Sequence, residues 1–584
     1  MDNNEIAKIL YEISEYLAMD DIPFKPQAYE KAAVIIDDLD EEVEKIYKKE
    51  GLGGLLKLPM IGKGIAEIIE ELLKTGKIKY YEQLKKKIPV NLSELTAVEG
   101  IGPKIIKKLY KELGVKNLRD LERVAKARKI RHLRDFGEKT ESNILKGIEF
   151  LKRSGNRFTL GSVIPRAREI EQKIKNLPGV KQAVIAGSIR RMKETIGDGD
   201  LLAAVFSFKD AGKVMDFFVS MPEVVHVYSK GPTRSSVRLR SDLDFDLRVV
   251  PEKSFGAALQ YFTGSKDHNI ALRKIAIEKR YRLNEYGLWK KGRMVAGKNE
   301  EEIYKILGLK IMEPELREDK GEIEASKIGR LPKIIKYSDL KGDLQVQTDW
   351  SDGSSSMEDY IEAAEKIGLE YIAITDHTKS LGVANGLDEK GLDKQSREID
   401  KINAKLKVKS KNLPAGRHGF KILKGAEVNI LKDGNLDIKD EALKKLDVVG
   451  VAIHSSFKMP KKEMTERIIK AMKNPHVDIV FHLTGRVINQ RPPYDLDIER
   501  VIKAAKETKT ILEINAHPSR LDIKDDYIRM AKEAGVKMEI SSDAHNVSYF
   551  QFLEYGISQA RRGWAEKKDI INAWPLEKML KMLK

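Results

Sequence analysis

The stretch from Ala186 to Asp200 carries the residues of this chain that are best suited to chemistry. It reads A-G-S-I-R-R-M-K-E-T-I-G-D-G-D. Asp198 and Asp200 are two positions apart, and side chains with that spacing lie on one face of a strand. Their carboxylates can therefore bind the same hard divalent cation. Gly187 and Ser188 let a phosphate approach the backbone closely, so the segment predicts metal-assisted nucleotidyl transfer.

A third carboxylate strengthens this interpretation. Asp246 stands in D-F-D-L-R-V-V, which alternates like a strand, and we expect it to face the first pair across a sheet. A D-x-D pair alone is weak evidence, because surface strands carry such pairs by chance. The preceding G-S-x-R-R and the third carboxylate together favour a metal site.

Length and composition set the frame in which these residues act. A chain of 584 residues with 41% hydrophobic content is expected to fold as several domains. No apolar run is long enough to cross a bilayer and M-D-N-N-E-I-A does not resemble a signal peptide, so we expect a cytoplasmic protein without membrane contacts. Since there are no cysteines, any metal must be held by His, Asp and Glu.

The positive charge is concentrated in one part of the chain. The net charge is +17, and residues 101–200 carry 25 Lys and Arg against 12 Asp and Glu. Such a concentration is typical of a surface that contacts a phosphate backbone. A solvated, lysine-rich surface is the alternative, and charge alone does not distinguish the two.

Two similar motifs near the N-terminus favour nucleic acid. The first 85 or so residues read as short amphipathic helices. L-P-M-I-G-K-G-I-A-E-I-I and V-E-G-I-G-P-K-I-I-K-K-L-Y each place glycines just before a helix, where backbone N–H groups can bind an anion. Both resemble helix-hairpin-helix motifs, which bind DNA phosphates without reading bases, although a plain helix–helix turn would look similar. The expected DNA-binding residues are Gly62, Gly64, Gly100, Gly102 and Lys104.

The C-terminal part alternates predicted strands and helices from Leu340 onward. Its strands end in His, Asp or Glu, as in I-T-D-H, V-A-I-H and S-S-D-A-H. This pattern predicts an α/β barrel with metal ligands at the carboxyl ends of the strands. Residues 409–420 interrupt it as a polar insertion, which we interpret as a surface loop.

Residues 1–320 resemble a family X DNA polymerase, the group that includes DNA polymerase beta. The resemblance implies that Asp198 and Asp200 serve both of two Mg²⁺ (or Mn²⁺) ions and that Asp246 lies beside the primer 3′-OH. It assigns the outgoing phosphates to Gly187, Ser188 and Arg191, the incoming sugar to the turn containing Tyr261, Phe262 and Gly264, and minor-groove contacts to Asn269 and Arg273. Gly199 departs from the apolar residue usual in the family.

The implied architecture is multidomain, with α-helical N-terminal domains, an α/β nucleotidyltransferase palm and a C-terminal distorted α/β barrel. The expected boundaries are 1–85 for a small lyase-like DNA-binding domain, 86–155 for a helix-hairpin-helix domain, 156–252 for the palm, 253–318 for the nascent-base-pair subdomain, 319–337 for a polar linker and 338–584 for the barrel.

The small N-terminal domain resembles the deoxyribose-phosphate lyase domain of DNA polymerase beta. That chemistry needs a lysine amine that forms a Schiff base. The alignment places Ile68 at that position, and neither Lys63 nor Lys74 nearby matches it. We therefore expect this domain to bind the 5′ side of a gap with weak or absent lyase activity.

Residues 338–584 resemble a polymerase and histidinol phosphatase (PHP) domain. The matching ligands, implied to hold Zn²⁺ or Mn²⁺ with partial occupancy, are Asp352, His377, Glu427, His454, His482, Asp543 and His545. Gln345 and Gln347 stand where the family has two histidines of the first of three metal positions, and a neutral amide is the weaker ligand. Related bacterial polymerases use this domain as a 3′–5′ exonuclease, whereas we expect little such activity here. His517 matches no ligand, and we interpret it as structural.

Together these features predict a gap-filling DNA polymerase in base-excision repair, acting as a monomer on gapped or primer-template DNA with dNTPs. The alternatives are a nucleotidyltransferase for RNA or small molecules, which would lack the paired hairpin motifs, and a DNA-binding scaffold, which would not need three carboxylates. A further alternative is a PHP phosphoesterase with a DNA-targeting arm, against which the altered first metal position argues.

Overall fold

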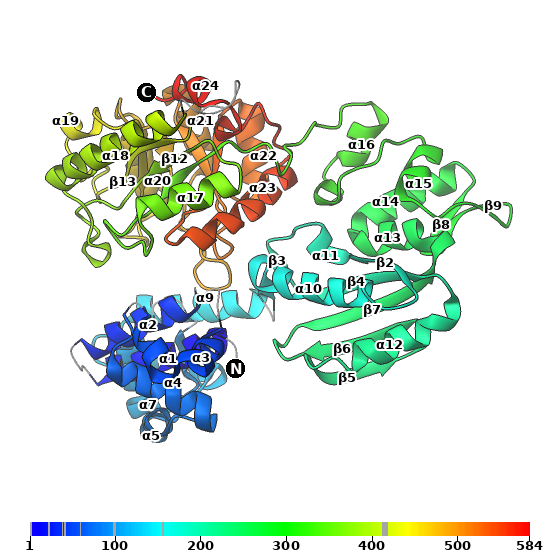
Figure 1. The fold of residues 1–584 in the computed structure, drawn as a ribbon. Helices are drawn as coiled ribbons and strands as arrows, with labels where there is room; N and C mark the ends of the chain where they lie inside the picture. Colours follow the sequence, from blue (N-terminus) through cyan, green and yellow to red (C-terminus); the bar gives the residue numbers. More distant parts are fainter. Residues whose placement is uncertain are drawn as a thin grey trace. The chain divides into compact units, whose positions relative to one another are not determined.

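The computed structural model describes residues 3–20, 24–37, 39, 42–58, 60–96, 98, 101–154, 157–410 and 419–584 (Figure 1). The chain forms two compact units, Met1–Gly155 with Asn489–Pro492, and Asn156–Ile488 with Pro493–Lys584. Residues 411–418 of the predicted polar insertion at 409–420 lie outside the described residues.

The first unit is helical. Its helices are α1 (Asn3–Met19), α2 (Lys25–Asp37), α3 (Val43–Leu56), α4 (Lys63–Thr75), α5 (Lys79–Lys87), α6 (Leu92–Thr96), α7 (Pro103–Leu113), α8 (Leu118–Lys126) and α9 (Glu138–Ser154). The apolar faces of α1 to α4 pack into one core, and those of α6 to α9 pack into a second. Each core brings one predicted hairpin motif to the start of a helix, α4 or α7.

The second unit begins with a mixed sheet in the strand order β2-β4-β7-β6-β5. Its strands are β2 (Val180–Ile185), β4 (Asp198–Val205), β5 (Val224–Lys230), β6 (Arg234–Leu239) and β7 (Asp244–Pro251). Helices α10 (Leu160–Lys175) and α12 (Ala211–Val219) supply apolar residues to the same core as this sheet. β4 and β7 pair in parallel, which brings the two aspartate-bearing segments side by side.

The next layer consists of α13 (Phe255–Thr263), α14 (Lys266–Glu278), α15 (Glu300–Ile306) and an antiparallel sheet of β8 (Arg282–Asn284), β9 (Gly287–Lys290) and β10 (Arg293–Ala296). The stretch predicted as a linker is folded, and it contains α16 (Glu322–Lys327). Glu322 is fully buried because it pairs with His268 at 2.6 Å, and Arg317 just before it is 1% exposed. The polar composition of this stretch therefore does not mean that its side chains are exposed to solvent.

The C-terminal half forms a nearly closed parallel barrel, as predicted. Its strands follow the order β11 (Gly342–Val346), β12 (Tyr371–Ile374), β13 (Lys421–Asn429), β14 (Val448–Ala452), β15 (Ile479–Val480), β16 (Ile511–Asn515) and β17 (Met538–Ser541). A parallel bridge from Val346 to Ala544 brings the first strand beside the last. The covering helices include α17 (Met357–Lys366), α18 (Glu389–Ser410), α20 (Lys461–Met472), α21 (Ile498–Thr508), α22 (Asp525–Ala534) and α23 (Leu553–Arg562) (Figure 1).

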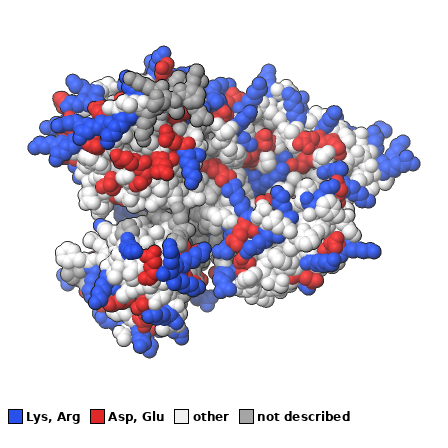
Figure 2. All heavy atoms as spheres, viewed as in Figure 1, with Lys and Arg blue, Asp and Glu red and all other residues white. Residues whose placement is uncertain are grey.

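Charged side chains of both signs are interleaved over the face drawn in Figure 2. The net charge of +17 is thus not displayed there as one continuous basic surface. Within the described part of the chain, every helix is too short or too polar to cross a membrane.

Candidate functional site

The three predicted aspartates lie together at one end of the β4–β7 pair. Asp200 is directly opposite Asp246 in the parallel register, and Asp198 is opposite Asp244. Asp198 is exposed at the start of β4, whereas Asp200 and Asp246 are half-buried. The i, i+2 spacing therefore places carboxylates from two neighbouring strands on one face, which suits a divalent cation.

Gly187 lies directly against the carboxylate of Asp200. Its backbone has φ +61°, and a Cβ built there would lie 2.2 Å from Asp200 Oδ2. A side chain at this position would clash with the carboxylate. An L-residue would also have to adopt a backbone conformation that it rarely takes, so only glycine fits. The short helix α11 (Gly187–Arg190) begins at this residue, and its Ser188 lines the same cavity as Asp198 and Asp200.

The surroundings make the negative charge of Asp200 costly. Burial, together with the neighbouring charges of Asp198 and Asp246, raises the pKa of Asp200 to about 7. Asp246 is partnered by Arg234, whose Nη2 lies 2.9 Å from Asp246 Oδ2. Arg248 and Arg191 offset this repulsion only in part, and a cation bound between the carboxylates would relieve the rest.

A cavity of about 350 Å³ adjoins the aspartates and brings together the residues that were predicted from different segments. Besides Asp198 and Asp200, it is lined by Gly187, Ser188, Arg191, Tyr261, Phe262, Gly264, Lys266, Asn269 and Arg273. Asn269 is fixed in this wall because its Nδ2 donates to the carbonyl of Tyr261 at 2.7 Å, while its Oδ1 accepts from Gln260 at 2.6 Å. A polar, partly enclosed site of this size suits a nucleotide.

Three basic residues of this region were not predicted from the sequence. Lys266 lines the cavity, Arg234 pairs with Asp246, and the Arg248 guanidinium lies 4.4 Å from the centre of the Phe262 ring. Arg248 could have been found by the rule that found the aspartates, because it follows Asp246 by two positions in β7. Arg234 and Lys266 carried no comparable signal.

Gly199, which departs from the family pattern, is explained by its neighbour. A Cβ at this position would lie 2.3 Å from two ring carbons of Phe245, the residue opposite it on β7. The Phe245 ring thus fills the space that an apolar side chain at position 199 would occupy, and the carboxylates of Asp198 and Asp200 keep their places on β4.

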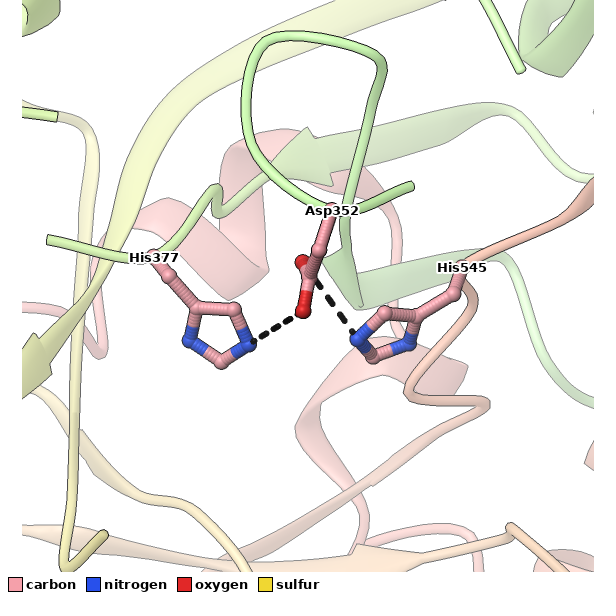
Figure 3. Close-up of side chains that lie close together, drawn as sticks. All are labelled: Asp352, His377 and His545. Atoms are coloured by element: carbon pink, nitrogen blue, oxygen red, sulfur yellow. Dashed lines mark ion pairs between the residues drawn. The ribbon is translucent and has the colours of Figure 1, made fainter. Parts of the chain in front are cut away.

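A second group of candidate ligands lies at the carboxyl ends of the barrel strands. Asp352 follows β11, His377 follows β12 and His545 follows β17, and their side chains converge in Figure 3. Asp352 Oδ2 lies 3.7 Å from His377 Nε2, and Oδ1 lies 3.6 Å from His545 Nε2. These separations exceed hydrogen-bond lengths and resemble the spacing of ligands that share one tetrahedral Zn²⁺. His545 Nδ1 bonds the carbonyl of Asp543 at 2.9 Å, so Nε2 is the nitrogen that faces Asp352.

An adjoining group centres on Glu427 of β13. His377, Glu427 and His454 place ligand atoms within 4.8 Å of one another. His454 Nε2 and His482 Nε2 lie 3.0 and 2.8 Å from Glu427 Oε1, and His454 Nδ1 is held by Asn429 at 2.8 Å. Both groups fit a Zn²⁺ or Mn²⁺ ion by donor type and by the orientation of the imidazoles.

The first metal position of the family does not fit a third ion in the same way. The amides of Gln345 and Gln347 each donate to Glu427 Oε2 at 2.8 Å, so that oxygen is already engaged by two protein donors. Asp543 Oδ2 accepts from Asn515 at 3.1 Å and lies 3.5 Å from Arg520 Nε. Among the residues described, Gln347 Oε1 remains without a partner, and it is a neutral acceptor.

His517 lies outside both groups. Its Nδ1 bonds Ser519 at 2.8 Å, and its ring packs on Tyr549 and Phe552. These contacts agree with the interpretation that it is structural.

In the helical unit, the motif glycines leave open space before their helices. A Cβ at Gly62, Gly64 or Gly102 would have no neighbour within 4 Å, and Gly62 and Gly102 are the N-cap residues of α4 and α7. Lys104 lies in the first turn of α7, whereas Gly100 lies outside the described residues. Ile68 packs its side chain against the apolar core of its domain.

Family models match most of these parts. They are a helix-hairpin-helix domain at residues 1–78, a SAM-like helix-hairpin-helix tandem at 92–149, a DNA polymerase beta thumb at 258–318 and a PHP domain at 343–517.

Known proteins resemble the chain over two different lengths. The DNA polymerase/3′-5′ exonuclease PolX of Bacillus subtilis (strain 168) is 37% identical over 589 aligned positions, which cover 100% of both chains. A probable phosphatase of Thermoanaerobacter sp. (strain X514) is 37% identical over 201 positions, which cover 33% of this chain and 73% of the phosphatase. A probable phosphatase of Acetivibrio thermocellus is 33% identical over a similar share. The full-length match, together with the hairpin, thumb and PHP domains, shows that the chain belongs to the bacterial PolX-type family X DNA polymerases.

Proposed function

We propose that this protein fills short gaps in DNA by template-directed nucleotidyl transfer at Asp198, Asp200 and Asp246. The observation that carries the proposal is the cavity, which unites two of the aspartates with the glycine turn and with Asn269 and Arg273. A nucleotidyltransferase for RNA or small molecules would share the aspartates but would not need the paired hairpin motifs or the wall from Tyr261 to Arg273. The domain boundaries predicted from the sequence belong to this proposal.

Each residue has a role that its position supports. Divalent ions, when bound by the three carboxylates, would stabilise charge on the attacking and leaving oxygens of an in-line displacement. Gly187 and Ser188 would hold the outgoing phosphates through backbone N–H groups, with Arg191 providing a guanidinium. Tyr261, Phe262 and Gly264 would pack against the incoming sugar. Gapped DNA would be held by the N-terminal hairpins through Gly62, Gly102 and Lys104.

The test is gap filling by the Asp200→Ala variant. We expect kcat to fall by about 10³-fold or more while affinity for gapped DNA is kept, because the change removes a ligand shared by both ions. Near wild-type extension would show that the active site lies elsewhere.

We further propose that the barrel is an exonuclease-type centre that holds two ions firmly and degrades 3′ ends slowly. Asp352, His377 and His545 form one ion site, and Glu427, His454 and His482 form the other. The supporting observation is that Gln345 and Gln347 engage Glu427 Oε2 as donors, where the family has two ligands. An amide N–H cannot bind a cation, so the third metal position lacks the two ligand atoms that the family's histidines would provide.

The double change Gln345→His with Gln347→His distinguishes this view from the alternative, in which the amide oxygens of Gln345 and Gln347 are sufficient to bind the third ion. We expect metal content per chain and 3′–5′ exonuclease activity both to rise. Robust Mn²⁺-dependent degradation by the wild type that His454→Ala abolishes would show that the centre works without the two histidines.

A further inference from the structure

A barrel residue reaches the turn that we assign to the outgoing phosphates. Arg562 ends α23, and its side chain is 2% exposed. Its Nη1 donates to the backbone carbonyl of Arg191 at 3.0 Å and lies 3.1 Å from Glu318 Oε1. Its Nη2 lies 2.7 Å from Asp525 Oδ2, which anchors the guanidinium in the barrel.

Glu318 connects this arginine to the one that lines the nucleotide cavity. The same oxygen, Glu318 Oε1, lies 3.0 Å from Arg191 Nε, and Arg191 Nη1 donates to the carbonyl of Thr263. Burial alone would raise the pKa of Glu318, but Arg562 and Arg191 outweigh it and hold that pKa below its usual value. One ionised carboxylate therefore bridges two guanidinium groups.

These contacts fix Arg191 before any nucleotide binds. Its Nε, its Nη1 and its backbone carbonyl all have protein partners, and Arg191 still lines the cavity. A guanidinium held in its binding orientation loses less conformational entropy when it takes up a phosphate. A small displacement of such a guanidinium sharply reduces its contribution to phosphate binding.

We infer that Glu318 and Arg562 are positioning residues for Arg191, so that the PHP barrel supports dNTP binding at the polymerase site. This inference rests on the proposed function, which gives Arg191 the phosphates of the incoming nucleotide. It assigns the barrel a role in polymerisation that is independent of its own metal centre.

The test uses Glu318→Gln and Arg562→Lys in the full chain, with single-nucleotide incorporation measured on gapped DNA. Glu318→Gln keeps the shape but weakens both bridges, and Arg562→Lys keeps the charge but cannot span three partners. We expect KM for the dNTP to rise about tenfold, with a smaller change in kcat and unchanged affinity for DNA.

The matched control is Arg168→Gln. Arg168 of α10 pairs with Glu554 of α23 at 3.0 Å, so it joins the same helix of the barrel to the palm but does not contact Arg191. Its dNTP KM should stay at the wild-type value. An equal rise of the dNTP KM in Arg168→Gln would mean that any weakening of the contact between the barrel and the palm raises KM. That result would overturn the positioning role of Glu318 and Arg562.

Arg191→Ala separates failure of the inference from failure of the proposed function. If Arg191→Ala leaves the dNTP KM unchanged, the phosphate role of Arg191 is wrong. If Arg191→Ala raises KM but Glu318→Gln and Arg562→Lys do not, the positioning role is overturned while the proposed function stands. Circular dichroism and barrel metal content verify folding, and the near-isosteric Glu318→Gln keeps the test decisive if Arg562→Lys does not fold.

Discussion

Asp200 is enclosed by two neighbouring carboxylates and by the Cα of Gly187, and this enclosure controls its protonation. Burial, with the charges of Asp198 and Asp246, raises the pKa of its carboxyl to about 7. A cation binds the ionised form, so proton and metal compete for the same group. The raised pKa also means that ionising Asp200 costs folding stability as pH rises from the unfolded value towards 7.

The competition predicts a pH-dependent metal requirement. Between pH 8 and pH 6, the Mg²⁺ concentration that gives half-maximal gap filling should rise about tenfold, because Asp200 becomes mostly protonated below pH 7. Magnesium titrations at constant ionic strength measure this directly. A half-saturating concentration that stays constant over this range would mean that Asp200 is not a ligand.

The aspartates were predictable because their signal is local. Spacing of i, i+2 in a strand places side chains on one face whatever the tertiary structure, and the same rule would have identified Arg248. The reason for Gly199 could not be predicted, because the Phe245 ring that fills its space comes from another strand. Likewise the bonds from Gln345 and Gln347 to Glu427 depend on how β11 and β13 are brought together.

At the level of the elements, the hairpin glycines show a difference between folding and binding. Gly102 has φ −91°, which any residue adopts, and open space where a side chain would stand. The fold therefore does not require glycine there, whereas close approach of a phosphate to the α7 N-terminus does.

Gly102→Val should therefore leave stability nearly unchanged and weaken DNA binding about tenfold, the equivalent of one lost hydrogen bond to a charged group. Fluorescence anisotropy with gapped DNA over a salt series measures the affinity, and the wild type should show a steep salt dependence. Gly53→Ala, in equally open space within α3, is the control and should bind as the wild type does. Full affinity in Gly102→Val would exclude this turn from the DNA contact.

The small N-terminal domain, residues 1–85, should lack efficient lyase chemistry. Ile68 has no amine, and the hydrogen bond from Lys74 to Glu70 raises the pKa of the Lys74 ammonium, which makes it a poorer nucleophile. Borohydride trapping on an incised abasic substrate should give little covalent adduct. Efficient trapping that survives mutation of Lys63 and Lys74 would place a nucleophile outside this motif.

Helices and strands with regular periodicity were predictable, and the folded stretch before the barrel was not. The polar composition of residues 319–337 predicted a linker, but Glu322 is buried with its ion-pair partner His268. Arg317, just before this stretch, is likewise buried with its partner Glu300. Burial of a charge depends on a partner that is distant in the sequence. A domain boundary predicted from local composition cannot take such distant pairs into account.

At the scale of the whole molecule, the chain combines a helical unit with a unit that contains both the palm and the barrel. The palm holds the aspartates, whose cavity it shares with residues from Tyr261 to Arg273. The barrel holds the His and Glu groups, and its Arg562 donates to the backbone carbonyl of Arg191. The roles proposed for Arg191, Glu318 and Arg562 therefore depend first on the palm being a template-directed polymerase site.

The most direct test of that claim is single-turnover incorporation on four one-nucleotide gaps that differ only in the templating base. With Mg²⁺ present, the wild type should insert the complementary dNTP at each gap far faster than the other three, and Asp200→Ala should insert none at a comparable rate. Equal insertion of all four nucleotides whatever the template, or near wild-type insertion by Asp200→Ala, would contradict a template-directed polymerase site at these aspartates.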